Sequence, residues 1–496
     1  MPWQNSPGGG ELQKYSQRHA EYYKGLFEQI EDEREKRSIP PAHVDNVRAA
    51  LEWCFGGNGS LAIGVGLAAV ATPVFLAMSL LPECHGWSER AIRALDDVTR
   101  GGSEEMNLQT SLGVSSMHVH GESDAARAAL SRSLTIAEAR GDVLNQVGLL
   151  GMLSMFDVRD DDFKRSLHFA RLSSAVGGTV QGSAAMALAN SILGRALQFV
   201  GDHGGSRRGL EASFHYWSRS QQTGEVYLGL DHHILVGIGL ARNLWLQGHP
   251  AQATERVRQT IREAERKDHP AREAERKDHP ASLGLALSWA PGLFLWTGDL
   301  QSADEHSNWL LSHAESHSLR PYLAVARGYR GSLAIGRGDA RTGVEDLENC
   351  LDQLHAMRYR MLNTGFELAL VQGLMTIGLY GKALALINET ISLVEANGDL
   401  VDMPEAPRVQ GNVLLSMPKR SPGEAEMCFV QSLDRSRRQG ARSWELRTAV
   451  DLAALWAAQG QPERARAVLE PIFDAFLEGL DTADLTAARR LLATLR

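Results

Sequence analysis

Two histidine clusters are the segments of this sequence whose residue types and spacing come closest to those of a metal site. His118 and His120 lie in MHVHG, and Asp231, His232 and His233 lie in LDHH. A tetrahedral site needs a full set of His, Cys or carboxylate ligands, and neither cluster is matched by a carboxylate or cysteine at helical spacing. We therefore interpret both clusters as polar residues near the ends of helical hairpins, and we predict no metal.

An acidic segment and a glycine-lysine segment are the other candidates for chemistry. DVRDDD, residues 157–162, lacks the glycine and the distal glutamate of a calcium-binding loop, which favours a solvated turn. GLYGKA, residues 378–383, lacks the first glycine and the Ser or Thr of an ATP-binding P-loop. The sequence also has no HExxH and no GxSxG motif. It therefore predicts a protein that is not an enzyme and that uses no cofactor.

The composition argues against nucleic acid as a direct partner. The formal net charge is -9 and the pI is about 6.0, whereas nucleic-acid binding needs a clustered basic surface. The cysteines are far apart and form no CxxC motif, so neither a zinc site nor a disulfide framework is indicated. They are Cys54, Cys84, Cys350 and Cys428. Because the first residues are polar and do not resemble a signal peptide, we predict a cytoplasmic protein.

One apolar segment is long enough to cross a bilayer. LAIGVGLAAVATPVFLAMSLL, residues 61–81, carries no charge over 21 residues. It is rich in glycine and alanine, contains Pro73, and lacks a flanking Lys/Arg cluster or an aromatic belt. These features favour a helix buried in a helical stack, with a membrane span as the alternative.

The remainder of the chain consists of successive helical patterns, because apolar residues recur at i, i+3, i+4 and i+7 between short polar breaks. No segment is predicted to be a strand. A repeat register appears when the glycine that ends one helix just before the next is taken as an anchor. These anchors are Gly121, Gly201, Gly248, Gly298, Gly338, Gly378 and Gly460. Asp161 and Arg420 are predicted anchors in the two wide gaps, which brings the spacing to between 40 and 50 residues.

The register places small and large residues at fixed positions. Five residues after each anchor the side chain is small, which predicts a close helix crossing: Ala126, Ser166, Ser206, Ala253, Ala303, Gly343, Ala383, Ala425 and Ala465. Nine residues after the anchor it is mostly large and apolar, which predicts core filling: Leu130, Leu210, Val257, Leu347, Ile387, Phe429 and Leu469, with Ala170 and Ser307 as weaker members. Ala91 and Leu95 share this mutual offset and indicate a further unit before the nine.

This pattern resembles the tetratricopeptide repeat, with a period near 40 residues in place of about 34. We therefore predict an all-α fold, a right-handed α-solenoid of about ten tetratricopeptide-like helical hairpins. Each hairpin would bury its apolar face only against its neighbours and leave a concave groove. We expect residues 1–57 to form an N-terminal helical junction and residues 58–496 to form the solenoid.

A duplication explains the one spacing of 50 residues. Residues 262–270 and residues 272–280 both read REAERKDHP. Because Pro270 and Pro280 end helical turns, the surplus copy can form an outward loop, and we expect a local irregularity there. A charged element that contacts a partner is the alternative.

The helices that would line the groove carry a few residues suited to binding. The candidate groove-binding residues are Arg242, Trp245, Arg327, Tyr329 and Arg330, which lie on the first helices of their hairpins. Their selection depends on that placement alone. The scattered tryptophans, including Trp245, are otherwise expected to pack in the core.

Residues 18–97 resemble a segment of bacterial STAND-type transcriptional regulators. The resemblance rests on RHAEYYKGLFEQIEDE (18–33), with His19, Ala20, Tyr22 and Tyr23, and on HVDNVRAALEWCFG (43–56), with Asp45, Asn46, Arg48, Ala50, Leu51 and Trp53. In such regulators these helices join an ATPase module to a C-terminal tetratricopeptide-like array. After residue 97 the likeness is one of architecture only. The DNA-binding and ATPase parts would precede residue 18. Either the coding sequence has lost its 5′ part, or its start is assigned too late, or an independent array is encoded beside a separate ATPase.

The resemblance implies a sensor or protein-interaction module that binds a ligand or partner in its groove and acts on an ATPase module. The partner would be a protein or peptide, with a small-molecule effector as a further candidate. The alternative is a free-standing tetratricopeptide scaffold that recruits a peptide or protein. An enzyme with an unrecognised site is the third hypothesis.

Overall fold

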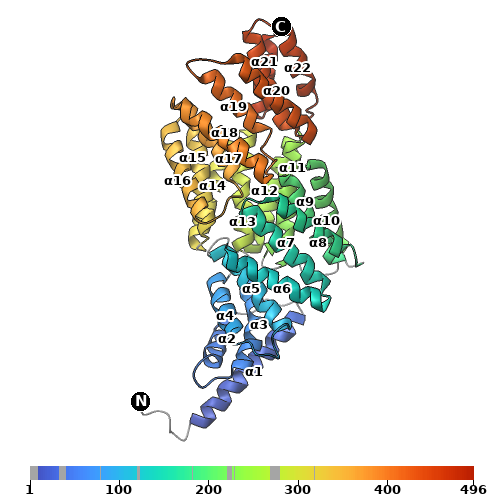
Figure 1. The fold of residues 1–496 in the computed structure, drawn as a ribbon, viewed down its shortest axis with the longest axis vertical. Helices are drawn as coiled ribbons and strands as arrows, with labels where there is room; N and C mark the ends of the chain where they lie inside the picture. Colours follow the sequence, from blue (N-terminus) through green and yellow to red (C-terminus); the bar gives the residue numbers. More distant parts are fainter. Residues whose placement is uncertain are drawn as a thin grey trace.

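The computed structural model describes residues 9–32, 41–78, 80–119, 123–180, 183–219, 226–227, 230–268, 280–317 and 319–495. The molecule is elongated, with the N-terminus at one end and the C-terminus at the other (Figure 1). Within the described ranges there are 23 α-helices and one small two-stranded ladder. The predicted all-α solenoid is confirmed.

Four helices form the N-terminal end. They are α1 (Gly9–Asp32), α2 (Pro41–Cys54), α3 (Leu61–Ala77) and α4 (Leu81–Arg93). Helix α1 packs against both α2 and α3, and Arg48 of α2 holds Glu83 of α4 through two hydrogen bonds of 2.7 and 2.6 Å. Ala20, Tyr23 and Leu51 are buried in the same hydrophobic core as α3 and α4. The residues that carry the STAND resemblance therefore include those that attach α1 and α2 to the array.

Nine further hairpins follow in chain order. They are α5 (Ser103–Val119) with α6 (Asp124–Arg140), α7 (Val143–Arg159) with α8 (Phe163–Gly177), α9 (Ser183–Phe199) with α10 (His203–Arg219), α11 (His232–Leu246) with α12 (Pro250–Asp268), α13 (Pro280–Thr297) with α14 (Leu300–Ser316), α15 (Arg320–Gly336) with α16 (Ala340–Ala356), α17 (Asn363–Thr376) with α18 (Tyr380–Asn397), α19 (Glu405–Ser416) with α20 (Pro422–Gln439), and α21 (Arg442–Ala458) with α22 (Pro462–Asp474). Helix α23 (Ala483–Thr494) packs on α21 and α22 at the C-terminal end. With α3 and α4 the described hairpins number ten, as predicted.

The predicted anchors lie between the two helices of each hairpin. Gly121 is outside the described residues. The other glycine anchors all have a positive φ, between 75° and 93°, a conformation that glycine adopts without steric cost. Asp161 has a φ of 70° and takes the same role without being glycine. Arg420 also lies between two helices, α19 and α20, but without a positive φ, and the chain leaves α19 through Met417, which is extended.

The small and large repeat positions are buried in all nine units. Two contacts show why the small residues are needed. A Cβ added at Gly343, a small repeat position, would lie 2.6 Å from the Gly331 carbonyl oxygen on the preceding helix. A Cβ added at Gly194, also on the first helix of its hairpin, would lie 2.8 Å from the side chain of Leu210, a large repeat position. The predicted close helix crossings are therefore confirmed.

The apolar segment at residues 61–81 is divided between two helices. Helix α3 contains Pro73 and ends at Ala77, and α4 begins at Leu81. Ten residues of α3 are buried, and the helix packs against α1, α4 and α5. Of the helices in the described ranges, none has the length and apolarity that a membrane span requires. The interpretation of this segment as a buried helix is confirmed.

The duplicated segment falls between two hairpins. Helix α12 continues through the first copy to Asp268, and α13 begins at Pro280. Residues 269–279, which hold most of the second copy, lie outside the described residues. The local irregularity predicted at the duplication falls on these residues and is therefore outside the described ranges.

The absence of strands was predicted, and the structure corrects this. Strand β1 (Val226–Tyr227) pairs antiparallel with β2 (Leu230–Asp231) just before α11. Each strand has two residues, too few to give a detectable alternation in the sequence.

Segments about 200 residues apart touch along the solenoid, so hairpins five units apart are in contact. We call the following hydrogen bonds the inter-turn contacts. The Arg360 amide donates to the Arg159 carbonyl at 2.8 Å, and the Leu400 amide donates to the Phe199 carbonyl at 2.8 Å. Arg358 binds the Asp160 carboxylate. Ser443 Oγ donates to the Trp245 carbonyl. One turn of the solenoid thus contacts the next, and helices α14–α18 lie alongside α7–α13 (Figure 1).

Candidate ligand-binding site

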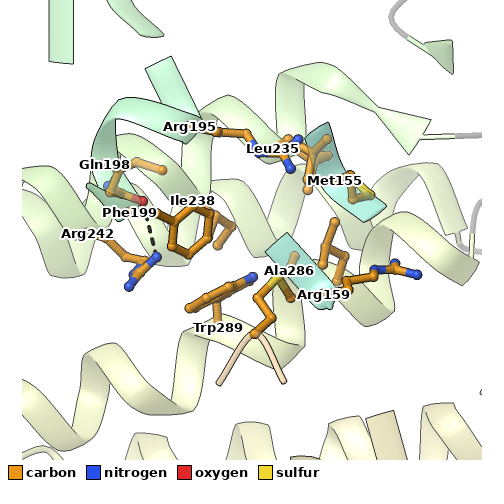
Figure 2. A pocket seen from close by; sticks show the side chains of 14 residues that line it. Met155, Arg159, Arg195, Gln198, Phe199, Leu235, Ile238, Arg242, Ala286 and Trp289 are labelled. Atoms are coloured by element: carbon orange, nitrogen blue, oxygen red, sulfur yellow. Dashed lines mark hydrogen bonds between the residues drawn. The ribbon is translucent and has the colours of Figure 1, made fainter. Parts of the chain in front are cut away.

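A small cavity lies where the first helices of three successive hairpins, α7, α9 and α11, face α13 (Figure 2). Its volume is about 30 Å³, which is more than one ordered water molecule requires. Its lining is Met155, Arg159, Arg195, Gln198, Phe199, Ile234, Leu235, Ile238, Gly239, Arg242, Leu285, Ala286, Trp289 and Met361. The lining thus contains three arginines and no carboxylates, and most of its other residues are apolar.

Arg195 of α9 and Arg159 of α7 form one side of the cavity. Arg159 is 1% exposed, its Nη1 donates to the Met117 carbonyl at 3.4 Å, and its guanidinium lies 5.3 Å from the Tyr359 ring centroid. Arg195 is half-buried, and burial together with the charge of Arg159 lowers the pKa of Arg195 to about 10. Two positive charges therefore influence each other at this side of the cavity.

Arg242 of α11 lies on the opposite side and is held by its neighbours. Its Nη1 donates to the Gln198 side chain at 3.1 Å, and its guanidinium lies 4.1 Å from the Trp289 ring centroid. Burial lowers the pKa of Arg242, while the charges of Asp402 and Asp399 raise it. Arg242 is thus stabilised by a cation–π contact and by nearby carboxylates.

The loop between α18 and α19 brings these carboxylates to Arg242. Asp399 and Asp402 are buried, and Thr364 Oγ1 donates to Asp399 at 2.8 Å. Burial raises the pKa of both carboxyls above the ordinary value, and the charge of Asp402 raises that of Asp399 further. Since the same loop contains Leu400, it also makes one of the inter-turn contacts.

Two buried histidines lie beside the arginine pair. Burial, followed by the charge of Arg159, lowers the pKa of His118 well below its ordinary value. Burial and the charge of Arg195 lower the pKa of His232 to about 3. Both imidazoles are therefore neutral at pH 7 and add no charge to the cavity.

The histidine clusters occupy hairpin ends, as interpreted from the sequence. Asp231 accepts hydrogen bonds from the His233 and Ile234 amides and so caps α11, and His233 lies 3.3 Å from Glu263. His120 is outside the described residues. Among residues with described positions, no group of three or more His, Cys, Asp or Glu side chains is placed to hold a metal ion.

The acidic segment at residues 157–162 is wrongly predicted as a solvated turn. Asp157 is fully buried and pairs with Arg127 at 2.5 Å and Arg165 at 2.8 Å. Asp162 caps α8, and Asp160 binds Arg358. The segment is acidic because its carboxylates hold neighbouring elements together, and the partners come from helices that the local pattern does not reveal.

The five predicted groove residues are separated by the fold. Arg242 lines the cavity, and the charge of nearby Tyr329 acts on it. Tyr329 is buried, and its hydroxyl donates to the Ser288 carbonyl at 2.8 Å. Trp245 is 2% exposed and stacks on Trp296 at 4.6 Å. The remaining two, Arg327 and Arg330, are exposed on α15.

Sequence reasoning missed Arg159, Arg195 and Trp289. The repeat register could have identified Arg195. Arg195 lies six residues before the anchor Gly201, and the predicted Arg242 lies six residues before the anchor Gly248. Equivalent repeat positions point in the same direction, so the pair marks the same face of α9 and α11. Arg159 has no such counterpart.

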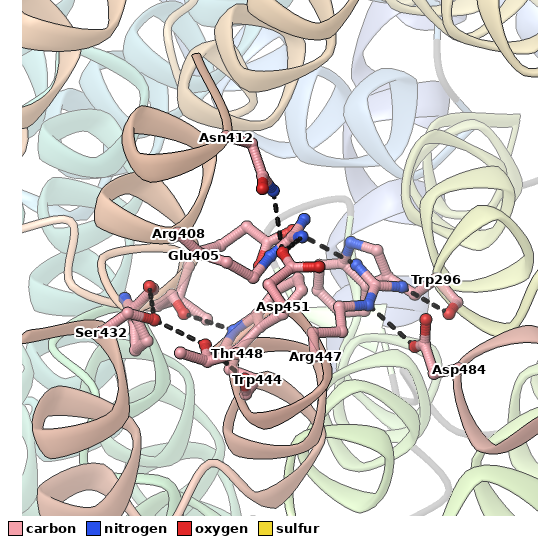
Figure 3. A network of polar contacts seen from close by, with 12 residues as sticks. Trp296, Glu405, Arg408, Asn412, Ser432, Trp444, Arg447, Thr448, Asp451 and Asp484 are labelled. Atoms are coloured by element: carbon pink, nitrogen blue, oxygen red, sulfur yellow. Dashed lines mark hydrogen bonds and ion pairs between the residues drawn. The ribbon is translucent and has the colours of Figure 1, made fainter. Parts of the chain in front are cut away.

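A second polar cluster lies near the C-terminal end (Figure 3). Arg408 binds Glu405 through two hydrogen bonds and Asp451 through one, at distances between 2.5 and 2.7 Å. Arg447 binds Asp484 at 2.8 Å and donates to the Trp296 carbonyl at 2.8 Å. Each of these arginines has a carboxylate partner, and Arg447 also connects α21 to α13 through the Trp296 carbonyl, so we interpret this cluster as structural.

The fold and the cavity define an α-solenoid of tetratricopeptide-like hairpins with a basic interior hollow. No protein-family model matches the chain, and no curated protein matches it. Among solved structures, the crystal structure of a Rap protein complexed with competence and sporulation factor has a TM-score of 0.55 at 10% identity, over 76% of this chain and 98% of that chain. At this identity the likeness establishes the fold alone.

Two further solved structures are less similar. The Rap conjugation gene regulator of a plasmid, in complex with a Phr peptide, has a TM-score of 0.44 at 10% identity, over 71% of this chain and 96% of that chain. A STAND protein with a tetratricopeptide repeat sensor from Pyrococcus horikoshii has a TM-score of 0.41 at 11% identity, over 96% of this chain and 74% of that chain. Scores at this level support no argument about function.

Proposed function

We propose that this chain is a non-catalytic sensor or protein-interaction module of a STAND-like transcriptional regulator. The observation that supports this most is that two cavity residues also make inter-turn contacts. Arg159 and Phe199 line the cavity with their side chains, and their carbonyls accept hydrogen bonds from Arg360 and Leu400. A ligand in the cavity would therefore act directly on the contacts between turns.

This coupling is what a sensor requires. A ligand shifts a conformational equilibrium only if it binds the two states with different affinity. A ligand that needs more room than the cavity offers would favour a state with looser inter-turn contacts. The change would then alter the surface that the solenoid presents to a partner.

The partner in this proposal is an ATPase module joined to the N-terminal helices. Residues 1–57 would form the junction and residues 58–496 the sensing solenoid. The exposed Tyr22 on α1 and the α2–α4 contact through Arg48 and Glu83 support a junction that is fixed to the array and still open on one side. Cys54, Cys84 and Cys350 are buried thiols without disulfides, which supports a cytoplasmic location.

The coding DNA immediately upstream provides the test of the regulator assignment. A P-loop in the same reading frame would support it, whereas an unrelated gene that ends close to Met1 would contradict it. A second measurement tests the non-catalytic part, because the purified chain is expected to hydrolyse no ATP or GTP. Hydrolysis that copurifies with the chain and is absent from a mock preparation would refute that part.

A free-standing scaffold for a peptide or protein is the second candidate. A hollow of about 550 Å³ on the outer face of α20 favours it, because Met427 and Val430 are exposed there at 66% and 47%. The solved Rap protein with a TM-score of 0.55 is bound to competence and sporulation factor, which is consistent with this candidate. Partners recovered by cross-linking at α20, and lost in a Met427→Lys variant, would support it over the regulator.

A further inference from the structure

Arg195 differs from the other arginines of the solenoid interior. It makes no hydrogen bond or ion pair with any residue that the structure describes, and no carboxylate lines the cavity. Arg408 and Arg447, in contrast, have carboxylate partners at 2.5 to 2.8 Å. Arg242 has Gln198, the Trp289 ring and two nearby carboxylates.

Arg195 therefore has no described partner that offsets the nearby positive charge of Arg159. A guanidinium that loses water beside a like charge is destabilised unless an anion compensates it. The depressed pKa of Arg195 has these two causes, burial and Arg159. Both effects would be relieved if an oxyanion occupied the hollow, since guanidinium groups bind carboxylate and phosphate oxygens in a forked geometry.

We infer that this cavity binds the anionic group of a small ligand, a carboxylate or a phosphate, through Arg195 with Arg159 beside it. Phe199 and Trp289 provide apolar surface for the body of the ligand. The Arg242 guanidinium, held between Gln198 and Trp289, faces the other side of the hollow (Figure 2). The inference deepens the proposed function, on which it rests, by naming the chemical class of the effector.

Thermal unfolding of the full chain in different anions tests this inference. Sodium phosphate and sodium acetate are each titrated against sodium chloride at constant ionic strength and pH 7, with Tm as the readout. We expect a saturable rise in Tm with phosphate, acetate or both, because a ligand that binds only the folded state stabilises it. Responses identical to chloride for both anions would overturn the inference.

Two variants assign the response to the cavity. Arg195→Met is expected to weaken anion binding about tenfold or more, because a charge-assisted hydrogen bond is lost. Arg341→Met changes an exposed arginine on α16 and is expected to leave the anion response unchanged. In chloride alone Arg195→Met should have the same Tm as the wild type or a higher one, since it removes an uncompensated charge. A lower Tm in chloride, or an undiminished anion response, would contradict the assignment.

The experiment separates this inference from the proposed function. An Arg195-dependent anion response in a chain without an upstream P-loop would support the cavity site and refute the regulator role. An in-frame P-loop together with no anion response would support the regulator role and refute the anion site in the cavity.

Discussion

Arg358 holds the Asp160 carboxylate through two hydrogen bonds of 3.0 and 2.9 Å, although 198 residues separate them in the chain. Asp160 lies in the turn between α7 and α8, and Arg358 precedes α17. The pair belongs to the inter-turn contacts, which join hairpins five units apart. Its effect on stability can be measured independently of any ligand.

Replacing Arg358 by alanine should lower the free energy of unfolding modestly. The Arg358 side chain is 43% exposed, so solvent screening limits the loss to about 0.5–1 kcal/mol. Guanidinium-induced unfolding followed by circular dichroism measures it. Arg93→Ala, which removes only an exposed pair within α4, is the control and should cost less. Equal losses in the two variants would argue against a stabilising inter-turn pair.

Gly194→Ala should destabilise the hairpin of α9 and α10. The new Cβ would lie 2.8 Å from the Leu210 side chain and 3.0 Å from the Leu210 backbone nitrogen. The backbone nitrogen cannot move away unless α10 shifts. We expect a loss of about 1–3 kcal/mol in unfolding free energy. The control is Gly381→Ala, where nothing lies within 4 Å and helix propensity predicts a gain of up to about 1 kcal/mol. A neutral Gly194→Ala would disprove the close crossing.

Asp399→Asn should stabilise the protein near neutral pH. The pKa of Asp399 is raised in the folded state by burial and by Asp402. A group with a raised folded pKa contributes stability below its unfolded pKa, near 4, and that contribution is lost as the pH rises through its folded value. Asparagine removes this ionisation and can still accept the hydrogen bond from Thr364.

Urea unfolding at several pH values from 4 to 8 measures this effect. The variant should gain on the order of 1 kcal/mol over the wild type at pH 8, and the gain should shrink toward pH 4. Asp339→Asn, at the exposed N-cap of α16, is a comparison outside the buried pair. A difference between Asp399→Asn and wild type that is the same at every pH would rule out the titration of Asp399 as its cause.

Deleting one ten-residue copy of the duplication should leave the fold intact. The deletion restores a 40-residue spacing between Gly248 and Gly298 and retains the sequence at both described helix ends, Asp268 and Pro280. A single cooperative melting transition with a Tm close to that of wild type is expected. Loss of cooperativity would mean that both copies are needed to connect α12 and α13.

The fold could be predicted from the repeat register because each hairpin packs mainly against the hairpins next to it in the sequence. The burial of Ala126 beside Leu130, and the equivalent pairs in the other units, follows from a spacing of four residues on one helix. The positive φ of Asp161 shows that the register also located an anchor without glycine.

The interior could not be predicted in the same way. Whether Arg358 meets Asp160 depends on small rotations summed over five hairpins, and no single residue encodes such a sum. The cavity has the same origin, because Arg195 and Arg159 approach only through the packing of α7 on α9. Asp157 was misjudged for a related reason, since the charge pattern shows acidity and not the partners that bury it.

The inter-turn contacts also have a mechanical consequence. A solenoid without inter-turn contacts extends elastically when its two ends are pulled, because only adjacent hairpins are in contact. Here the hydrogen bonds at Arg159, Phe199 and Trp245 fasten one coil to the next, so the middle of the molecule resists stretching while the four N-terminal helices lie outside the fastened region. Under tension applied at both ends, the coils would separate before any hairpin unfolds, and the extension curve would show that release as a distinct early step.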